Sequence, residues 1–141
     1  MRTVLAPLLS SVLLLAALAG CSSHPPPTGL TVALTKLERM ADGTLTATLQ
    51  FTNEAVVAFI VAGSRHQVFL NGQPAGMIDI KEPLGLPSEQ VRTQSAKFVP
   101  TGAAPAAGDA SYRLDSTLTL LLYGDSKEVH KTSSSGTVRV Q

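Results

Sequence analysis

The sequence has one cysteine, no tryptophan and few aromatic residues, since Phe, Tyr and Trp together make up 4% of the chain. A single cysteine, Cys21, cannot form a disulfide within one chain, so a folded domain must be stabilised by its core. Four Phe and two Tyr leave little material for an aromatic sugar platform or a base-stacking surface. No run of Lys or Arg is present, which disfavours nucleic acid and anionic surfaces as partners.

Sequence motifs for catalysis or metal binding are also missing. The histidines are His24, His66 and His130, and no two of them stand at the short spacings of a local metal site. The serines at 133–135 lack a nucleophile-elbow pattern, and no glycine-rich phosphate loop occurs. His66 follows Arg65 in a predicted strand and is interpreted as a solvent-facing residue. We therefore expect no catalytic residues, no metal, no cofactor and no enzymatic activity.

The amino-terminal segment contains the one long apolar run of the sequence. Arg2 is its only charge, and no charged side chain follows from Val4 to Leu18 before the small pair Ala19-Gly20, which is the layout of a secretory signal. An apolar stretch of about fifteen residues would form a helix of roughly 22 Å, short of the roughly 30 Å hydrocarbon layer. We therefore interpret residues 1–20 as a cleaved signal peptide.

Cys21 completes the tetrapeptide "LAGC" at residues 18–21, which resembles the lipobox of bacterial lipoproteins. The resemblance implies that the Cys21 sulfur receives a diacylglyceryl group, that the chain is cut before Cys21, and that the new amino terminus is acylated. Two or more acyl chains hold a protein on a bilayer durably. Ser22 follows in place of the Asp of the inner-membrane retention signal, so we expect an outer-membrane anchor facing the periplasm in a cell with two membranes. The alternative is an ordinary secretory leader followed by an incidental cysteine.

The remaining chain divides into a short tether and one domain. Residues 21–29 contain the lipidated Cys21 and the polar, proline-rich "SSHPPPTG", which should be extended by at most about 3 Å per residue. Residues 30–141 have the length of a single domain. Loss of Arg2 with the leader leaves ten of the eleven Lys and Arg residues against ten Asp and Glu, so the mature net charge is zero.

Alternation of apolar and polar residues predicts that residues 30–141 form an all-β domain. The segment "TLTATLQFT" at 44–52 places its leucines and Phe51 on one face and its threonines on the other, and residues 112–122 alternate similarly. Asn71-Gly72 between two apolar arms predicts a type I′ hairpin, with Pro74 favouring an edge position for the second arm. We expect seven or eight strands in a fibronectin- or immunoglobulin-like antiparallel β-sandwich.

The order of motifs between residues 45 and 99 is also informative. A strand ends in "FTNEA", and "VVAFIVAGS", "HQVFLNGQPAGMID", "GLPSEQ" and "VRTQSAKFV" follow. This order resembles the type 2 late embryogenesis abundant domain, also called the water-stress and hypersensitive-response domain. The matching positions are Asn53 in the turn, Val68, Leu70, Asn71, Gly72 and Gly76 in the hairpin, and Leu86 and Pro87 in the loop. The family's turn is often Asn-Pro-Asn, whereas this chain has Thr52-Asn53-Glu54.

The resemblance implies a fibronectin-like β-sandwich without catalytic residues, with a role in protecting membranes or proteins during dehydration or freezing. The leading hypothesis is therefore a lipid-anchored, non-enzymatic binding or stress-protective domain of the bacterial envelope. Its partners would be the membrane, through the anchor, and protein clients. The alternative is an assembly or adaptor lipoprotein whose sheet edge pairs with a strand of a larger envelope complex.

Overall fold

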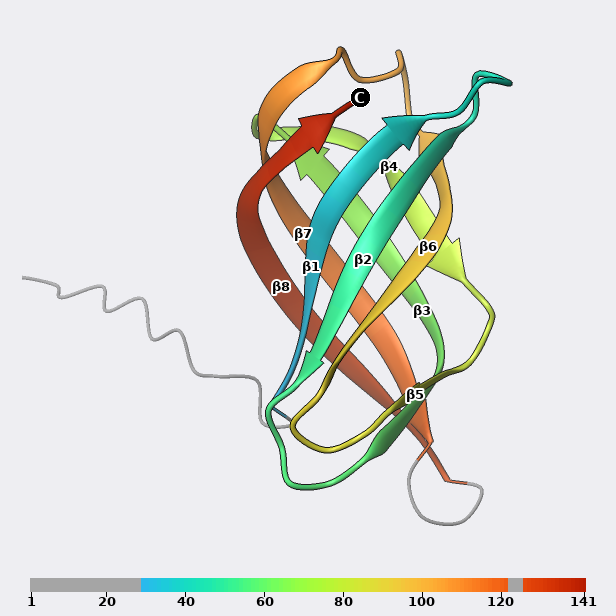
Figure 1. Cartoon of the computed structure of the whole chain (residues 1–141), viewed down its shortest axis with the longest axis vertical. Coiled ribbons are helices and arrows are strands. Elements are labelled where there is room, and N and C mark those ends of the chain that lie inside the picture. Colours follow the sequence, from blue (N-terminus) through green and yellow to red (C-terminus); the bar gives the residue numbers. More distant parts are fainter. Residues whose placement is uncertain (1–28, 122–125) are drawn as a thin grey trace, which may run out of the picture.

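A computed structural model describes residues 29–121 and 126–141, and within these ranges the chain forms β-strands and no helix (Figure 1). The strands are β1 (Leu30–Arg39), β2 (Leu45–Asn53), β3 (Phe59–Leu70), β4 (Gln73–Ile80), β5 (Leu84–Leu86), β6 (Val91–Pro100), β7 (Gly108–Leu121) and β8 (Lys127–Val140). The all-β prediction is confirmed. Nothing in the described ranges forms a helix that could span a membrane. The predicted leader, Cys21, most of the tether and the turn at 124–125 lie outside the described residues.

The strands form a single mixed sheet rather than the two separate sheets of the expected sandwich. Its order is β4-β6-β2-β1-β8-β7-β3-β5, and an additional pairing of β4 with β3 closes it into a barrel-like shape. The long pairings are antiparallel, whereas β1 and β8 run parallel and share one register pair, Leu37 with Val140. β4 and β6 share three pairs, from Gly76 to Ile78 on β4. One extensively paired group therefore contains β6, β2 and β1, and the other contains β8, β7, β3 and β4. The short pairings of β1 with β8 and of β4 with β6 join the two groups, and we call them seams.

Gly76 permits the seam between β4 and β6. A Cβ atom built on Gly76 would lie 2.4 Å from the carbonyl oxygen of Val99 and 2.5 Å from Cζ of Phe98. Both of these atoms belong to β6, so a side chain at position 76 would force the two strands apart. The match of Gly76 to the family hairpin therefore has a packing explanation, because the sheet closes where this residue has no side chain.

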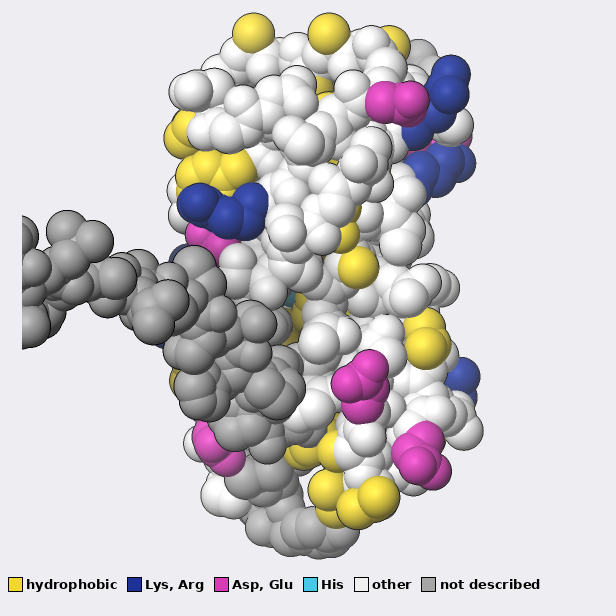
Figure 2. Space-filling view, turned by 90° about the vertical axis from the view of Figure 1, so that its left-hand side faces the viewer, with side chains coloured by type: hydrophobic (Ala, Val, Ile, Leu, Met, Phe, Trp, Pro, Cys, Tyr) yellow, Lys and Arg dark blue, Asp and Glu magenta, His cyan; other side chains and the backbone are white. Residues whose placement is uncertain are grey.

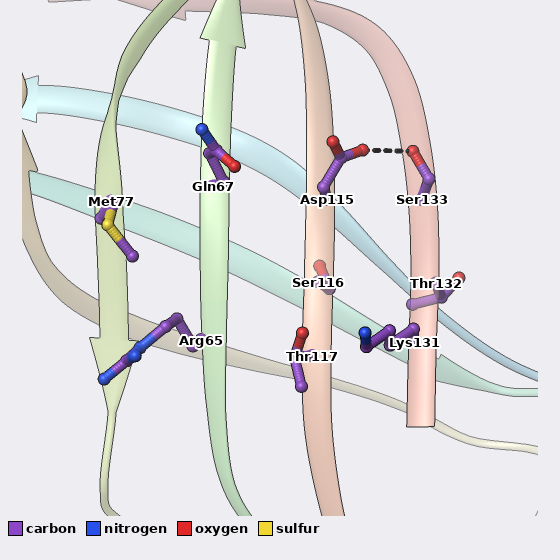
Figure 3. A pocket seen from close by; sticks show the side chains of 9 residues that line it. All are labelled: Arg65, Gln67, Met77, Asp115, Ser116, Thr117, Lys131, Thr132 and Ser133. Carbon is purple, nitrogen blue, oxygen red and sulfur yellow. Dashed lines mark hydrogen bonds between the residues drawn. The ribbon is translucent and has the colours of Figure 1, made fainter. Parts of the chain in front are cut away.

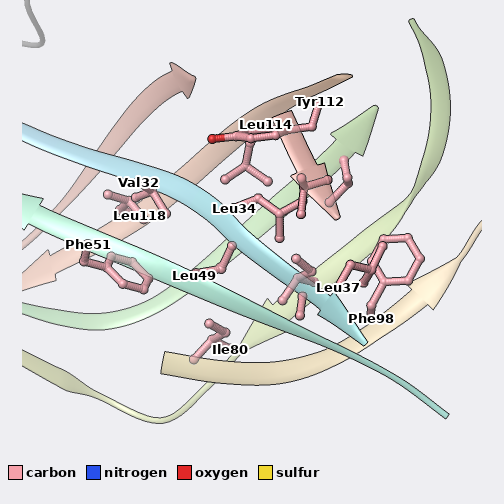
Figure 4. Packing of buried hydrophobic residues seen from close by; sticks show 14 of the residues in the cluster. Val32, Leu34, Leu37, Leu49, Phe51, Ile80, Phe98, Tyr112, Leu114 and Leu118 are labelled. Atoms are coloured by element: carbon pink, nitrogen blue, oxygen red, sulfur yellow. The ribbon is translucent and has the colours of Figure 1, made fainter. Parts of the chain in front are cut away.

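The core consists of the side chains that point from the strands into the barrel. On β2 the predicted row is buried, and Leu49 and Phe51 are fully inaccessible to solvent. On β7 the leucines at 114, 118 and 120 are buried in the same way. Figure 4 shows side chains from β1, β2, β6 and β7 gathered in the interior, among them Val32, Leu34, Leu37, Leu49, Phe51, Phe98, Tyr112, Leu114 and Leu118. Full burial of one such side chain is worth about 1.5–3 kcal/mol.

The predicted hairpin between β3 and β4 is present. Asn71 and Gly72 have φ angles of 48° and 79°, as a type I′ turn requires. Pro74 pairs with Phe69 of β3, and β4 meets β6 only from Gly76 onward. The proline therefore lies where β4 has one neighbouring strand, in agreement with the expected edge position.

Candidate functional site

Two adjoining hollows cover the outer face of β3, β4, β7 and β8, and we call them together the outer groove. The first has a volume of about 460 Å³ and is lined by Arg65, Gln67, Met77, Asp115, Ser116, Thr117, Lys131, Thr132 and Ser133 (Figure 3). The second, of about 660 Å³, shares Arg65, Thr117 and Lys131 with the first and extends to Gly63, Asp79, Lys81, Thr119 and Lys127. Most of the residues that line the groove are therefore polar or charged.

Strand register explains which side chains meet in the outer groove. Arg65 of β3 lies opposite Thr117 of β7, and Thr117 lies opposite Lys131 of β8. Side chains opposite one another in an antiparallel pair point to the same face, so these three form one row across the outside of the barrel. In the next row, Ser133 Oγ donates a hydrogen bond of 2.7 Å to Asp115. The row positions are polar because they face away from the core.

Positive charge gathers at the second hollow. Arg65, Lys81, Lys127 and Lys131 line it, with Asp79 as the one carboxylate among its lining residues. Arg65 and Asp79 approach to 3.3 Å as an exposed ion pair, which is worth about 0–1 kcal/mol. Figure 2 shows charged side chains of both signs scattered over the side of the barrel that it presents.

The sequence analysis missed this gathering of charge. It searched for a continuous run of basic residues, whereas the four cations come from β3, the residue after β4, and β8. The available signal was the spacing of Lys127 and Lys131, which puts both on one face of a strand. Their proximity to Arg65 depends on the pairing of β3, β7 and β8, which no local pattern encodes.

The prediction for His66 was wrong, because its side chain is fully buried. The His66 ring packs edge-on against Phe51 at a centroid distance of 6.1 Å. Its Nδ1 lies 2.7 Å from Oγ of Ser116, and its Nε2 lies 2.8 Å from Oγ of Ser64. Burial lowers the pKa of His66 to about 4, against the opposing effect of the Asp79 carboxylate. The ring is therefore neutral near pH 7, with one nitrogen donating and the other accepting.

A bulge in β3 changes which positions of the strand face the core. The pairing of β3 with β7 shifts register between Val61 and Gly63. Before the shift the buried positions include Phe59 and Val61, and after it they are the even-numbered positions from Ser64 to Leu70. One extra residue therefore moves His66 from the solvent side to the core side. Gly63 within an apolar run was the local signal of such a bulge.

The contacts between histidine and serine lie beneath the outer groove. Ser64 and Ser116 are largely buried together with His66, and both hydroxyls are bonded to its ring. Both ring nitrogens bond to hydroxyls and neither to a carboxylate, so the histidine has no acidic partner to orient it as a general base. Among the described residues no group of three or more His, Cys, Asp or Glu side chains could hold a metal ion.

The family-motif residues of the turn and of the Leu-Pro loop contact one another. Asn53 is buried, and its side-chain nitrogen donates hydrogen bonds to the carbonyl oxygens of Val57 at 2.7 Å and Pro87 at 3.0 Å. Its Oδ1 accepts a bond of 2.9 Å from the N–H of Ala55. Leu86 lies in the core beside this network. Asn53 thus ties the β2–β3 loop to the segment after β5.

The motif residues of the hairpin lie toward the other end of the barrel. Val68 and Leu70 are buried in the core. The side-chain oxygen of Asn71 accepts hydrogen bonds from the N–H and the hydroxyl of Ser111, at 3.1 and 3.2 Å. These bonds attach the turn to β7. None of the eight motif residues lines the outer groove, so their roles in the structure are those of a scaffold.

No family model and no curated protein matches the chain, whereas several solved structures do. The solution structure of an Arabidopsis thaliana protein is 18% identical over 83% of this chain and 84% of its own, with a TM-score of 0.48. That of a putative late embryogenesis abundant protein is 15% identical over 78% and 70%, with a TM-score of 0.43. The periplasmic chaperone SfaE is 12% identical over 80% and 57%, with a TM-score of 0.36.

Proposed function

We propose that this chain is a lipid-anchored protein of the bacterial envelope whose β domain binds and protects membrane or protein clients during dehydration or freezing, without enzymatic activity. The lipobox-like "LAGC" at 18–21 supports the anchor, and the motif order between residues 45 and 99 supports the protective role. The observation that carries the proposal of binding is the outer groove, whose lining residues include many hydrogen-bond donors.

The outer groove offers groups that can replace water on a client. Thr117 and Thr119 supply hydroxyls that both donate and accept, and Lys127 and Lys131 supply ammonium donors. Water normally satisfies the polar groups of a client surface, and its removal leaves them unpaired at a cost of about 1–3 kcal/mol each where they become buried. The exposed ion pair of Arg65 and Asp79 can exchange partners easily, because it contributes little to the stability of the fold.

The test of the anchor begins with Cys21→Ser in a bacterial host that carries the full chain. We expect wild-type protein in the membrane fraction with a blocked amino terminus, and Cys21→Ser protein either released or retained as the precursor. Mature wild-type protein with a free amino terminus would show that the chain is secreted without acylation.

The test of the protective role dries a labile enzyme with the purified protein and measures the activity that survives. We expect Lys127→Glu combined with Lys131→Glu to lose at least half of the protection. Arg92→Glu combined with Lys97→Glu, which reverses two exposed cations of β6 outside the groove, is the matched control and should retain it. Equal protection by both variants would show that the outer groove is not the contact surface.

An adaptor function is the second candidate, and the edge of β6 favours it. Residues 91–97 of β6 pair with β2 on one side, whereas β4 pairs with β6 only at residues 98–100. An unpaired edge of this length can accept an extended strand from another protein. A stoichiometric partner in a pull-down from intact membranes would support the adaptor, and protection of the dried enzyme without such a partner would support the first proposal.

A further inference from the structure

The β2–β3 loop, residues 54–58, presents two large apolar side chains to solvent. Val56 is 85% exposed and Val57 is 40% exposed. Two further exposed apolar residues lie at the same end of the barrel, Ile60 at the beginning of β3 and Val91 opposite Thr52 of β2. Isolated exposed valines are ordinary, but here two of them are adjacent in one loop, and two further exposed apolar residues lie at the same end of the barrel.

Hydrogen bonds hold this loop in place. Asn53 bonds to the backbone of both Ala55 and Val57, as described above. The carbonyl oxygen of Ala55 also accepts a bond of 3.2 Å from the N–H of Glu89. The N–H and carbonyl groups of Ala55 and the carbonyl group of Val57 are thus bonded within the protein, while the two valine side chains remain exposed. The loop is therefore attached to the rest of the domain while it presents apolar side chains to solvent.

The chain passes against this loop as it enters β1 (Figure 1). The carbonyl oxygen of Gly29 accepts a hydrogen bond of 2.9 Å from the N–H of Glu54. A Cβ atom on Gly29, whose φ is 66°, would lie 3.1 Å from the nitrogen of Ala55. Gly29 follows Cys21 by eight residues. Even a fully extended chain of that length spans only about 26 Å, so an anchor at Cys21 would keep this end of the barrel near the bilayer.

We propose that the β2–β3 loop is a membrane-contacting surface, with Val56 and Val57 entering the interface of the bilayer that holds the Cys21 anchor. This inference rests on the proposed lipid anchor. Two valines bind a bilayer weakly by themselves, but a tether of this length makes the contact intramolecular and raises the effective lipid concentration. The loop contains no Lys or Arg, Glu54 lies within it and Glu89 bonds to it, so the surface fits zwitterionic rather than anionic lipid.

The experiment uses a new cysteine as a reporter of lipid contact. Acylation occupies the Cys21 sulfur, so a thiol-reactive environment-sensitive fluorophore would label Val56→Cys alone in the full lipidated chain. Met40→Cys is the matched control, because Met40 is an apolar residue, 45% exposed, at the opposite end of β1. Both proteins are reconstituted into phosphatidylcholine vesicles that contain spin-labelled lipid as the quencher.

We expect lipid quenching at position 56 to be at least threefold stronger than at position 40, with blue-shifted emission only at position 56. Equal and weak quenching at both positions, with the protein still bound to the vesicles, would overturn the loop contact and leave the anchor intact. Protein that separates from the vesicles on flotation would overturn both proposals. A blue shift at position 56 that needs a second protein copy, and not lipid, would instead assign the loop to a dimer and overturn this inference.

Discussion

β2 and β3 both lie within the closed sheet, but their inward rows differ in chemistry. β2 buries Leu45, Ala47, Leu49 and Phe51 in one apolar row, and only its last inward residue, Asn53, is polar. After its bulge, β3 buries the polar pair Ser64 and His66 before returning to apolar residues. The interior beneath β2 therefore depends on packed apolar area, whereas the interior beneath this part of β3 also depends on hydrogen bonds of defined geometry. Substitutions in the two strands should accordingly destabilise the domain for different physical reasons.

Leu49→Ala on β2 should produce the largest effect. The side chain is fully buried, so its truncation removes the favourable free energy of burying it and also leaves a cavity. Together these should lower the free energy of unfolding by about 2–5 kcal/mol. That is a large share of the stability of a domain of this size. Urea denaturation checks the value, with Val99→Ala as a control because Val99 is 54% exposed. Equal midpoints for the two variants would contradict the assignment of Leu49 to the core.

His66 should make the stability of the protein depend on pH. Its pKa is about 4 in the folded state and about 6.5 in the unfolded chain, so stability is complete above pH 6.5, where both states hold the neutral ring. As the pH falls from 6.5 to 4, the unfolded chain gains a proton that the folded state excludes. The free energy of unfolding should fall by up to about 3 kcal/mol across this window, at about 1.4 kcal/mol per pKa unit.

Denaturation at pH 7 and pH 4.5 measures this dependence, and His66→Leu separates it from the titration of other groups. The leucine variant should be less stable at pH 7, since Ser64 and Ser116 lose their shared partner. Its stability should change less than that of the wild type between the two pH values. An unchanged pH dependence in the variant would show that the ring is not the responsible group.

Gly76→Ala tests the seam between β4 and β6. In the sheet, β6 lies beside β2 and β4 pairs with β3. The new Cβ would overlap the backbone of Val99 and the ring of Phe98, so we expect a loss of about 1–3 kcal/mol. Gly85→Ala is the control, because no atom lies within 4 Å of a Cβ built there. Thermal melts that fall equally for both variants would mean that the close approach at Gly76 carries no cost.

Gly72→Val should produce the smallest of these effects and tests the hairpin that ends β3. The position has a φ of 79° and open space around it, so the strain is purely one of backbone conformation. We expect a loss of about 1 kcal/mol or somewhat more. Gly102→Val, also in open space but without a positive φ, should be close to neutral in the same thermal melt.

The elements that could be predicted from the sequence are those in which one face is consistently apolar. The row of β2, the leucines of β7 and the Asn71-Gly72 turn were all identified, because period-2 alternation and positive φ are local properties. β5 was missed within a proline-containing loop, since its three residues become a strand only by pairing with β3. The prediction for His66 was wrong although a local signal was present, because His66 alternates in step with the buried Val68 and Leu70.

The candidate site was less predictable than the fold. The eight motif residues were identified, but sequence could not show that Asn53 bonds to Pro87, which lies 34 positions away. The outer groove was missed because its cations belong to strands that are distant in sequence. Both depend on tertiary pairing, which local patterns do not encode.

The contact between His66 and Ser116 has a consequence for how β3 and β7 find their alignment. Leu114 and Leu118 flank Ser116 in the inward row of β7, and a leucine row alone would tolerate a slide of two residues. In the native alignment His66 lies opposite Ser116. A slide of two residues would place the imidazole against leucine and leave buried hydroxyls unpaired, at a cost of about 1–3 kcal/mol for each group. The polar pair thus discriminates against misaligned sheets that the apolar residues would accept.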